Sequence, residues 1–302
     1  AKVHGMEGIG FGFFYLYIFL TTYFLFPYVL LVGVKYSKLS KENSAFGMIA
    51  GLAIIWFAYV IWVGGDFMEF RFLVQALPFI GISIIYALYR LINNKKVVLV
   101  LTGGMLLGNI NSFFTIEQTV VTYGIETVES LAFHLSEDDQ NWVDIGKRLN
   151  EVFGDNDVSV ALAAAGAIPY YSKLHSVDYL GLCDAKIPEI GHKLSKVPGH
   201  RIIAPLEYIF NRHVNLLIDP INYMVPNNEV QQLVRSSNWG LMNKMHLKIN
   251  ERVNGYYITE AVWIVIEINS NYSLLVWYMT PDQEIDEVIR KHGFQRFRLR
   301  RS

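Results

Sequence analysis

Cysteine and charged residues are both scarce in this sequence of 302 residues. The only cysteine is Cys183, which excludes an intrachain disulfide and a cysteine-rich zinc site. Charged residues make up 18% of the chain, against about 25% in an ordinary soluble domain. The formal net charge is −1, so the chain lacks the basic excess of a nucleic-acid-binding protein. Nucleic acid is therefore not an expected partner.

These few charges are distributed unevenly along the chain. Residues 1–116 hold 12 of the 53 charged residues and have a net charge of +4. Residues 117–302 hold the other 41 and have a net charge of −5. The first composition is typical of a membrane segment and the second of a water-facing domain. We therefore predict an α-helical membrane segment over 1–116, followed by an exterior α/β domain over 117–302.

Four windows of the first segment lack charged side chains and are long enough to cross a bilayer, which takes about 20 apolar residues. They cover residues 8–34, 45–63, 72–89 and 97–116. We expect four transmembrane helices in contact with the lipid bilayer. The first window is too long for the apolar region of a signal peptide. The last window ends in several polar residues, so its helix is expected to leave the hydrocarbon near Leu107.

The loops between these windows predict their orientation. Residues 35–41 include three lysines, and residues 90–96 include one arginine and two lysines. Residues 64–71 instead carry two acids and one arginine. Because cytoplasmic loops are enriched in Lys and Arg, the first two loops are expected in the cytoplasm. The acidic loop, the N-terminus and the C-terminal domain then lie on the exterior side.

Two glycine pairs match the small-xxx-small spacing that lets helix backbones approach closely. They are Gly47 with Gly51 and Gly104 with Gly108. We expect both pairs at contacts between membrane helices.

After residue 116 the periodicities are those of a globular α/β protein. Trp142, Ile145, Leu149 and Val152 have the spacing of an amphipathic helix. Apolar runs and turn residues predict the other elements. These are strands at 158–164 and 214–218, a hairpin of 261–268 with 272–279, a helix at 282–292 and an exposed-face strand in the basic tail.

The loop at residues 64–72 is the strongest candidate for chemistry. It places Asp66, Glu69 and Arg71 between two predicted membrane helices. An arginine at a membrane interface can hold a lipid phosphate through two hydrogen bonds, and a carboxylate can orient or deprotonate a sugar hydroxyl. The alternative is a solvated loop in which an acid pairs with Arg71, and the charges alone favour that alternative.

Several motifs in this order resemble a known family. Residues 64–78 read Gly-Gly-Asp-Phe-Met-Glu-x-Arg-Phe-Leu-x-x-Ala-Leu-Pro. Residues 164–172 read Ala-Ala-Gly-Ala-Ile-Pro-Tyr-Tyr-Ser, residues 177–184 read Val-Asp-Tyr-Leu-Gly-Leu-Cys-Asp, and Pro-Gly-His follows at 198–200. Together they resemble bacterial polytopic glycosyltransferases of the GT-C type, such as the terminal β-arabinofuranosyltransferases of mycobacterial cell-wall synthesis.

The sequence departs from the family pattern at two positions. Phe70 replaces a small residue, often glycine, before the arginine, and Gln75 replaces a proline.

The resemblance implies a multi-pass enzyme of the bacterial plasma membrane whose C-terminal domain faces the periplasm or exterior. Such an enzyme transfers a sugar from a polyprenyl-phosphate sugar donor to a glycan or glycolipid acceptor of the cell envelope. The family places its catalytic acid in an earlier exterior loop. The chain is therefore expected to be the C-terminal part of a longer protein, with the main catalytic base outside it.

Roles for individual residues follow from this resemblance. Arg71 is assigned to the donor phosphate and Asp66 to the sugar or acceptor, with Glu69 as a further candidate. Stabilising the departing phosphate requires a cation, so a divalent metal is a candidate cofactor, although no metal-binding residues are assigned.

Further candidates lie in the exterior domain. Residues 166–171 are expected to shape a strand-to-loop turn, and Tyr170 and Tyr171 within them are weak candidates for stacking on an acceptor sugar. Asp184 and His200 are carried over from the family pattern. These two, with His175, Asp178 and His192, invite comparison with a metal site, but their spacing fits no dedicated motif. Surface or capping roles are the favoured interpretation of this set.

Two other functions compete with the enzyme. The chain is alternatively a non-catalytic membrane-anchored protein that binds a glycan or a protein partner. A transporter comes third, because the four windows contain no charged residue of the kind that marks an ion pathway.

Overall fold

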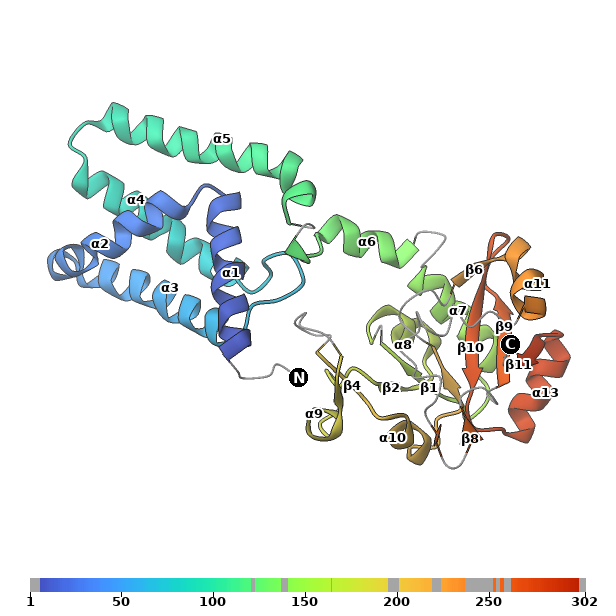
Figure 1. Cartoon of the computed structure of the whole chain (residues 1–302). Coiled ribbons are helices and arrows are strands. Elements are labelled where there is room, and N and C mark those ends of the chain that lie inside the picture. Colours follow the sequence, from blue (N-terminus) through green and yellow to red (C-terminus); the bar gives the residue numbers. More distant parts are fainter. Residues whose placement is uncertain are drawn as a thin grey trace. The chain divides into compact units, whose positions relative to one another are not determined.

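The computed structural model describes residues 6–120, 123–136, 141–163, 165–194, 201–218, 224–236, 252–253, 256–257 and 262–298. The chain has a helical N-terminal region with apolar helices, followed by a mixed α/β domain (Figure 1). Contacts divide it into two compact units, with the main division between Val128 and Glu129. The division by contacts therefore falls later than the change in composition at residue 116. The two units are described separately.

The helical unit contains five α-helices and one 3₁₀ turn in its described residues. They are α1 (Met6–Thr22), α2 (Phe26–Glu42), α3 (Ser44–Val63), η1 (Val74–Ala76), α4 (Leu77–Leu91) and α5 (Lys95–Val120). Helices α2, α3 and α4 pack against one another (Figure 1). Three segments are long and apolar enough to cross a membrane: Ser44–Val63, Val74–Leu91 and Lys95–Ile116. They correspond to the second, third and fourth predicted windows.

The prediction of one continuous helix over residues 8–34 is wrong. The window contains α1 and the start of α2, which are bent by 112° at a short break. Pro27 lies in the first turn of α2, and its ring cannot continue a helix from α1. Phe24, in the break, has a left-handed backbone with φ of 55°. The window counts as a fourth crossing only if the bent pair forms a single span.

Polar side chains of α5 bind the backbone at this break. Asn109 donates its side-chain amide to the carbonyl of Tyr23 at 3.2 Å. The Ser112 hydroxyl donates to the carbonyl of Thr22. In an apolar environment a broken helix needs such partners for its freed carbonyls. The polar residues that interrupt the fourth window thus stabilise the break in the first.

Glycines allow close contacts between the helices. A Cβ atom on Gly47 would lie 2.9 Å from the Ser40 side chain, and one on Gly51 would lie 3.2 Å from the Tyr36 hydroxyl. The first predicted pair therefore lies at the α2–α3 contact. In the second predicted pair only Gly108 lies at a close contact, with the Phe24 ring. Gly104 has no atom within 4 Å of its Cβ position.

The tightest of these contacts is at Gly12 of α1 and was not predicted. A Cβ atom there would lie 2.3 Å from the carbonyl oxygen of Ile61 in α3. Gly8, one turn earlier, packs its backbone against Gly64 at the end of α3. Gly8 and Gly12 have the same small-xxx-small spacing, so this signal was present in the sequence.

The α/β unit is built on a mixed sheet in the order β11-β9-β10-β5-β1-β2, with β6 also paired to β10. Strand β1 is parallel to β2 and β5, and the remaining pairs are antiparallel. The strands are β1 (Ser159–Leu162), β2 (His175–Asp178), β5 (Leu216–Leu217), β6 (Met224–Pro226), β9 (Val262–Glu267), β10 (Tyr272–Tyr278) and β11 (Gln295–Arg298). Two short pairs lie outside it: β3 (His192–Lys193) with β4 (Ile202–Ile203), and β7 (Arg252–Val253) with β8 (Tyr256–Tyr257).

Further helices follow α5 in the chain. They are α6 (Val128–Ser136), α7 (Trp142–Phe153), α8 (Ala167–Ser172), α9 (Ile187–Ile190), α10 (Leu206–Asn211), α11 (Asn227–Ser236) and α13 (Gln283–His292). Alternate strand residues enter two separate apolar cores. Val160 belongs to the core that contains Ile145 of α7 and Ile285 of α13, whereas Ala161 belongs to the core that contains Ile209 of α10.

Most predicted elements of this unit are confirmed. The helix from Trp142 extends to Phe153, and the hairpin forms from β9 and β10 with its turn at residues 269–271. Helix α13 begins after Asp282, whose side chain accepts hydrogen bonds from two backbone N–H groups of the first turn. A strand occurs in the basic tail at 295–298.

Two predicted strands of this unit are shorter than expected. The strand predicted over 158–164 covers Ser159–Leu162. The strand predicted over 214–218 covers only Leu216–Leu217, because the sheet partners pair with just these two residues.

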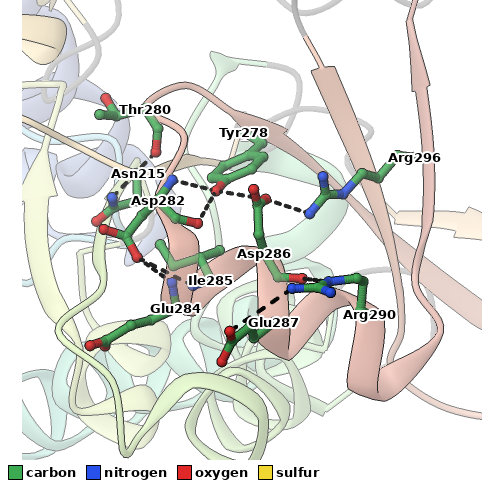
Figure 2. A network of polar contacts seen from close by, with 10 residues as sticks. All are labelled: Asn215, Tyr278, Thr280, Asp282, Glu284, Ile285, Asp286, Glu287, Arg290 and Arg296. Carbon is green, nitrogen blue, oxygen red and sulfur yellow. Dashed lines mark hydrogen bonds and ion pairs between the residues drawn. The ribbon is translucent and has the colours of Figure 1, made fainter.

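A polar network joins the end of β10 to α13 (Figure 2). The Tyr278 hydroxyl lies 3.0 Å from the carbonyl oxygen of Asp282 and 3.1 Å from Oδ1 of Asp286, and it accepts the N–H of Asp282 at 2.6 Å. Arg296 of β11 pairs with Asp286 at 2.5 Å. Burial, followed by the Asp286 carboxylate, raises the pKa of Tyr278 to about 12, against the lowering effects of the Asp282 N–H and Arg296.

This network predicts a loss of stability at alkaline pH. The pKa of an unfolded tyrosine is about 10, so Tyr278 stabilises the fold fully below about pH 10 and loses that contribution as the pH rises through about 12. Melting temperatures measured across this window should fall less steeply for Tyr278→Phe than for the wild type. The exposed Tyr170 gives a matched control, Tyr170→Phe, and an equally steep fall in both variants would contradict the prediction.

Candidate functional site

The loop between α3 and α4 begins with two glycines that terminate α3. Gly64 and Gly65 have φ of 83° and 67°, in the left-handed region that favours glycine. A Cβ atom on Gly64 would lie 2.9 Å from the carbonyl oxygen of Gly8, and one on Gly65 would lie 2.8 Å from the Tyr15 ring. The glycines therefore hold the start of the loop against α1, and the chain then turns to Asp66.

Asp66 and Arg71 form an ion pair across this loop. The side chain of Asp66 is 2% exposed and that of Arg71 is 50% exposed. Nε of Arg71 donates to Oδ2 of Asp66, and Oδ1 of Asp66 accepts the N–H of Phe67 at 3.0 Å. The pairing that the charges alone favoured is therefore present, but its carboxylate is buried rather than solvated.

The pair leaves one edge of the Arg71 guanidinium available. Among the described residues, the polar partner of Arg71 is Asp66, which takes Nε. The edge formed by Nη1 and Nη2 can bind a phosphate or carboxylate through two hydrogen bonds. The buried Asp66 thus fixes a half-exposed arginine with its anion-binding edge free of protein partners in the described part of the chain.

The structure shows how Phe70 is accommodated at the position where the resemblance predicts a small residue, often glycine. Its φ is 31°, which is uncommon for a residue with a side chain and favours glycine. Its ring is buried, with centroids 5.3 Å from the Tyr15 and Phe19 rings and 5.7 Å from the Tyr23 ring. This aromatic packing compensates for the unfavourable backbone at a position where glycine was expected.

Gln75 bonds to the same loop. With its amide oriented to satisfy both groups, its nitrogen donates to the carbonyls of Arg71 at 3.1 Å and Phe72 at 3.2 Å. A proline at this position would lack these bonds.

Glu69 contacts groups from two other parts of the helical unit. Its Oε2 accepts the backbone N–H of Val128 at 2.8 Å, and its Oε1 accepts the hydroxyl of Tyr23 at 3.4 Å. Sequence spacing could not reveal these partners, because they are 59 and 46 residues away. Tyr23 is therefore a residue of the site that the sequence analysis missed.

Tyr170 and Tyr171 lie on helix α8 and not on the predicted strand-to-loop turn. Their rings are nearly perpendicular, at 89°, with centroids 5.0 Å apart. Tyr170 is 75% exposed, whereas Tyr171 is partly buried, with Nζ of Lys147 5.7 Å from its ring centroid. Only Tyr170 therefore presents a largely open ring.

Asp184 belongs to a separate cluster with Tyr208 and Arg212. Its carboxylate accepts the N–H of Lys186 at 2.8 Å, the hydroxyl of Tyr208 at 2.9 Å and Nη1 of Arg212 at 3.2 Å. Partial burial acts to raise the pKa of Asp184, but the hydrogen bonds and Arg212 outweigh it and hold the pKa below its usual value. These bonds join the loop after β2 to α10, so the geometry gives Asp184 a structural role.

The other candidates in the α/β unit are not brought together. Asp178 is buried and accepts the N–H groups of Leu180 and Cys183, which fixes the turn after β2. His175 and His192 are exposed on different strands. His200 lies outside the described residues. Within the residues that the structure describes, no three His, Cys, Asp or Glu side chains are grouped as metal ligands would be.

One comparison with known proteins gives a match. Residues 131–277 match a family model described as "Domain of unknown function (DUF8728)". This stretch is therefore similar to that family, and the acidic loop lies outside it. No curated protein and no solved structure matches the chain.

Proposed function

We propose that the chain is part of a membrane glycosyltransferase that moves a sugar from a polyprenyl-phosphate donor to a cell-envelope glycan or glycolipid. The observation that carries the proposal is the Asp66–Arg71 pair, which holds an arginine half-exposed with its Nη edge free among the described residues. The order of motifs that resembles the GT-C glycosyltransferases supports the same function.

Membrane location is part of this proposal. The loop connects α3 to η1 and α4. It therefore lies between two segments that are long and apolar enough to span a bilayer. Such a loop would lie where lipid phosphates are found. We place the chain in the bacterial plasma membrane, with the loop and the α/β unit on the exterior side. The basic loops at 35–41 and 90–96 support this orientation through the positive-inside rule.

In the proposed reaction, Arg71 stabilises the leaving group. The acceptor hydroxyl attacks the anomeric carbon of the donor, the bond from that carbon to the phosphate oxygen breaks, and a base takes the hydroxyl proton. Negative charge then grows on the departing polyprenyl phosphate, where a fixed guanidinium stabilises it. Both Asp66 oxygens accept hydrogen bonds within the loop, so we assign Asp66 to orienting Arg71. The base is assigned to a residue outside this chain.

A divalent metal would supply the same charge stabilisation as Arg71 and stays part of the proposal as an alternative cation. Tyr170 stays a candidate for stacking on an acceptor sugar, because its ring is exposed.

Replacing Arg71 with lysine tests this function. Lysine keeps the positive charge that pairs with Asp66, but it lacks the planar guanidinium that holds a phosphate through two hydrogen bonds. Sugar transfer from labelled polyprenyl-phosphate sugars, measured with the full-length protein in membranes, should fall about a hundredfold. Arg90→Lys is the matched control, because Arg90 also forms an ion pair in the helical unit and its side chain is 48% exposed.

Two results would count against the proposal. Equal transfer by Arg71→Lys and the wild type would remove Arg71 from the donor site. A wild-type protein that binds a glycan but transfers no sugar would favour the non-catalytic binding protein.

A further inference from the structure

We propose that Glu69 is a positioning residue that holds the loop against the segment 126–128, and thereby keeps Arg71 in place for the donor phosphate. This inference rests on the proposed function only for the identity of the ligand. The attachment of the loop is a separate claim about the helical unit and can be tested without any substrate.

Backbone pairing provides the first part of the attachment. The N–H of Glu69 donates to the carbonyl of Glu126 at 2.8 Å, and the N–H of Glu126 donates to the carbonyl of Phe67 at 2.7 Å. Met68 and Glu126 thereby form a parallel bridge. The middle of the loop is thus paired with a segment more than 50 residues later. The bridge is too short to be stable without side-chain support.

The Glu69 side chain supplies that support from two directions. Its Oε2 extends the pairing by accepting the N–H of Val128, and its Oε1 accepts the hydroxyl of Tyr23 beside the break between α1 and α2. Hydrogen bonds to a charged group are stronger than hydrogen bonds between neutral groups. Phe70, the next residue, packs its ring against Tyr23, so backbone, carboxylate and ring fix the residues just before Arg71.

A role as catalytic acid or base is the competing interpretation of Glu69. It requires an oxygen that faces the substrate, whereas both oxygens of Glu69 have partners within the helical unit. Glutamine separates the two interpretations. Its carbonyl oxygen can accept the N–H of Val128, and its amide can donate to the oxygen of Tyr23. Glutamine therefore preserves the attachment but cannot transfer a proton.

The experiment compares Glu69→Ala, Glu69→Gln and wild type in the full-length protein in detergent. Hydrogen exchange reports the protection of residues 64–71 and 123–128, and titration with polyprenyl phosphate reports binding. Glu69→Ala should speed exchange in both segments and weaken binding about tenfold, as expected for the loss of hydrogen bonds to a charged group. Glu69→Gln should weaken binding clearly less than Glu69→Ala, because it keeps both hydrogen bonds without the charge, and it should leave the shape of the pH profile of transfer unchanged. Glu42→Ala, which removes the partner of Arg90, is the matched control.

The possible results separate this inference from the proposed function. Unchanged exchange in Glu69→Ala overturns the attachment, and equal damage from Glu69→Gln and Glu69→Ala overturns the positioning role in favour of a direct one. A wild type that neither binds polyprenyl phosphate nor transfers sugar overturns the proposed function. In that case faster exchange in Glu69→Ala, restored in Glu69→Gln, still establishes the attachment.

Discussion

Gly12→Leu should prevent the helical unit from folding. The contact that it breaks is between two backbones: the Cβ position of Gly12 is 2.3 Å from the carbonyl oxygen and 2.7 Å from the Cα atom of Ile61. Even one added carbon forces α1 away from α3, and no side-chain rotation relieves a clash with backbone. Overpacking usually costs about 1–3 kcal/mol, and a clash with a helix backbone should exceed that range.

The consequences of Gly12→Leu extend to the loop. Separating α1 from α3 also removes the contacts of Gly8 with Gly64 and of Tyr15 with Gly65, which hold the start of the loop. The measurement is the yield of monodisperse protein after extraction from membranes, together with its melting temperature. Gly10→Leu is the matched control, because Gly10 lies on the same helix, is exposed and has no atom within 4 Å of its Cβ position. Similar yields from both variants would contradict the helix contact.

Arg71→Ala should destabilise the helical unit by about 3–5 kcal/mol, whereas Asp66→Asn should cost clearly less. The two partners of this pair differ in exposure. Removing Arg71 leaves the Asp66 carboxylate, which is 2% exposed, without its ionic partner. Removing the charge of Asp66 leaves a guanidinium that is 50% exposed and that water can solvate. The cost of breaking an ion pair depends on the burial of the charge that remains.

Thermal unfolding of the two variants in detergent measures this difference. Arg90→Ala provides the control, because its partner Glu42 is 33% exposed and loses less when it is left unpaired. The prediction fails if Arg71→Ala and Arg90→Ala lower the melting temperature equally. It also fails if Asp66→Asn is the more damaging of the two changes at the loop, since the burial of the remaining charge would then not decide the cost.

Local sequence patterns were sufficient to predict those helices and strands that are determined by their own periodicity. The amphipathic spacing from Trp142 predicted α7, because one face of that helix enters a core. The apolar runs at 262–278 predicted the hairpin, because both faces of its strands are buried. The short strand β5 shows the limit of such patterns. Its length depends on the partners β1 and β10, and the apolar run that contains it carries no information about them.

The site shows the same limit. The motif at 64–71 identified Asp66, Glu69 and Arg71 as candidates, but not which acid pairs with the arginine. Only the fold shows that Asp66 is buried under Arg71, while Glu69 bonds to Tyr23 and Val128. Likewise, the sequence around Asp184 did not indicate that Tyr208 and Arg212 would donate hydrogen bonds to its carboxylate.

The sequence by itself determined the division into an apolar helical region and a mixed α/β domain, because composition and periodicity act over neighbouring residues. Tertiary structure alone decided the 112° bend between α1 and α2, the exposure of each partner in the loop, and the attachment of Glu69. Proline predicts that a helix stops, but the path of the chain afterwards depends on Asn109 and Ser112, which lie more than 80 residues away. Such contacts arise between segments distant along the chain, and they set the burial and hydrogen bonding on which the chemistry of a charged side chain depends.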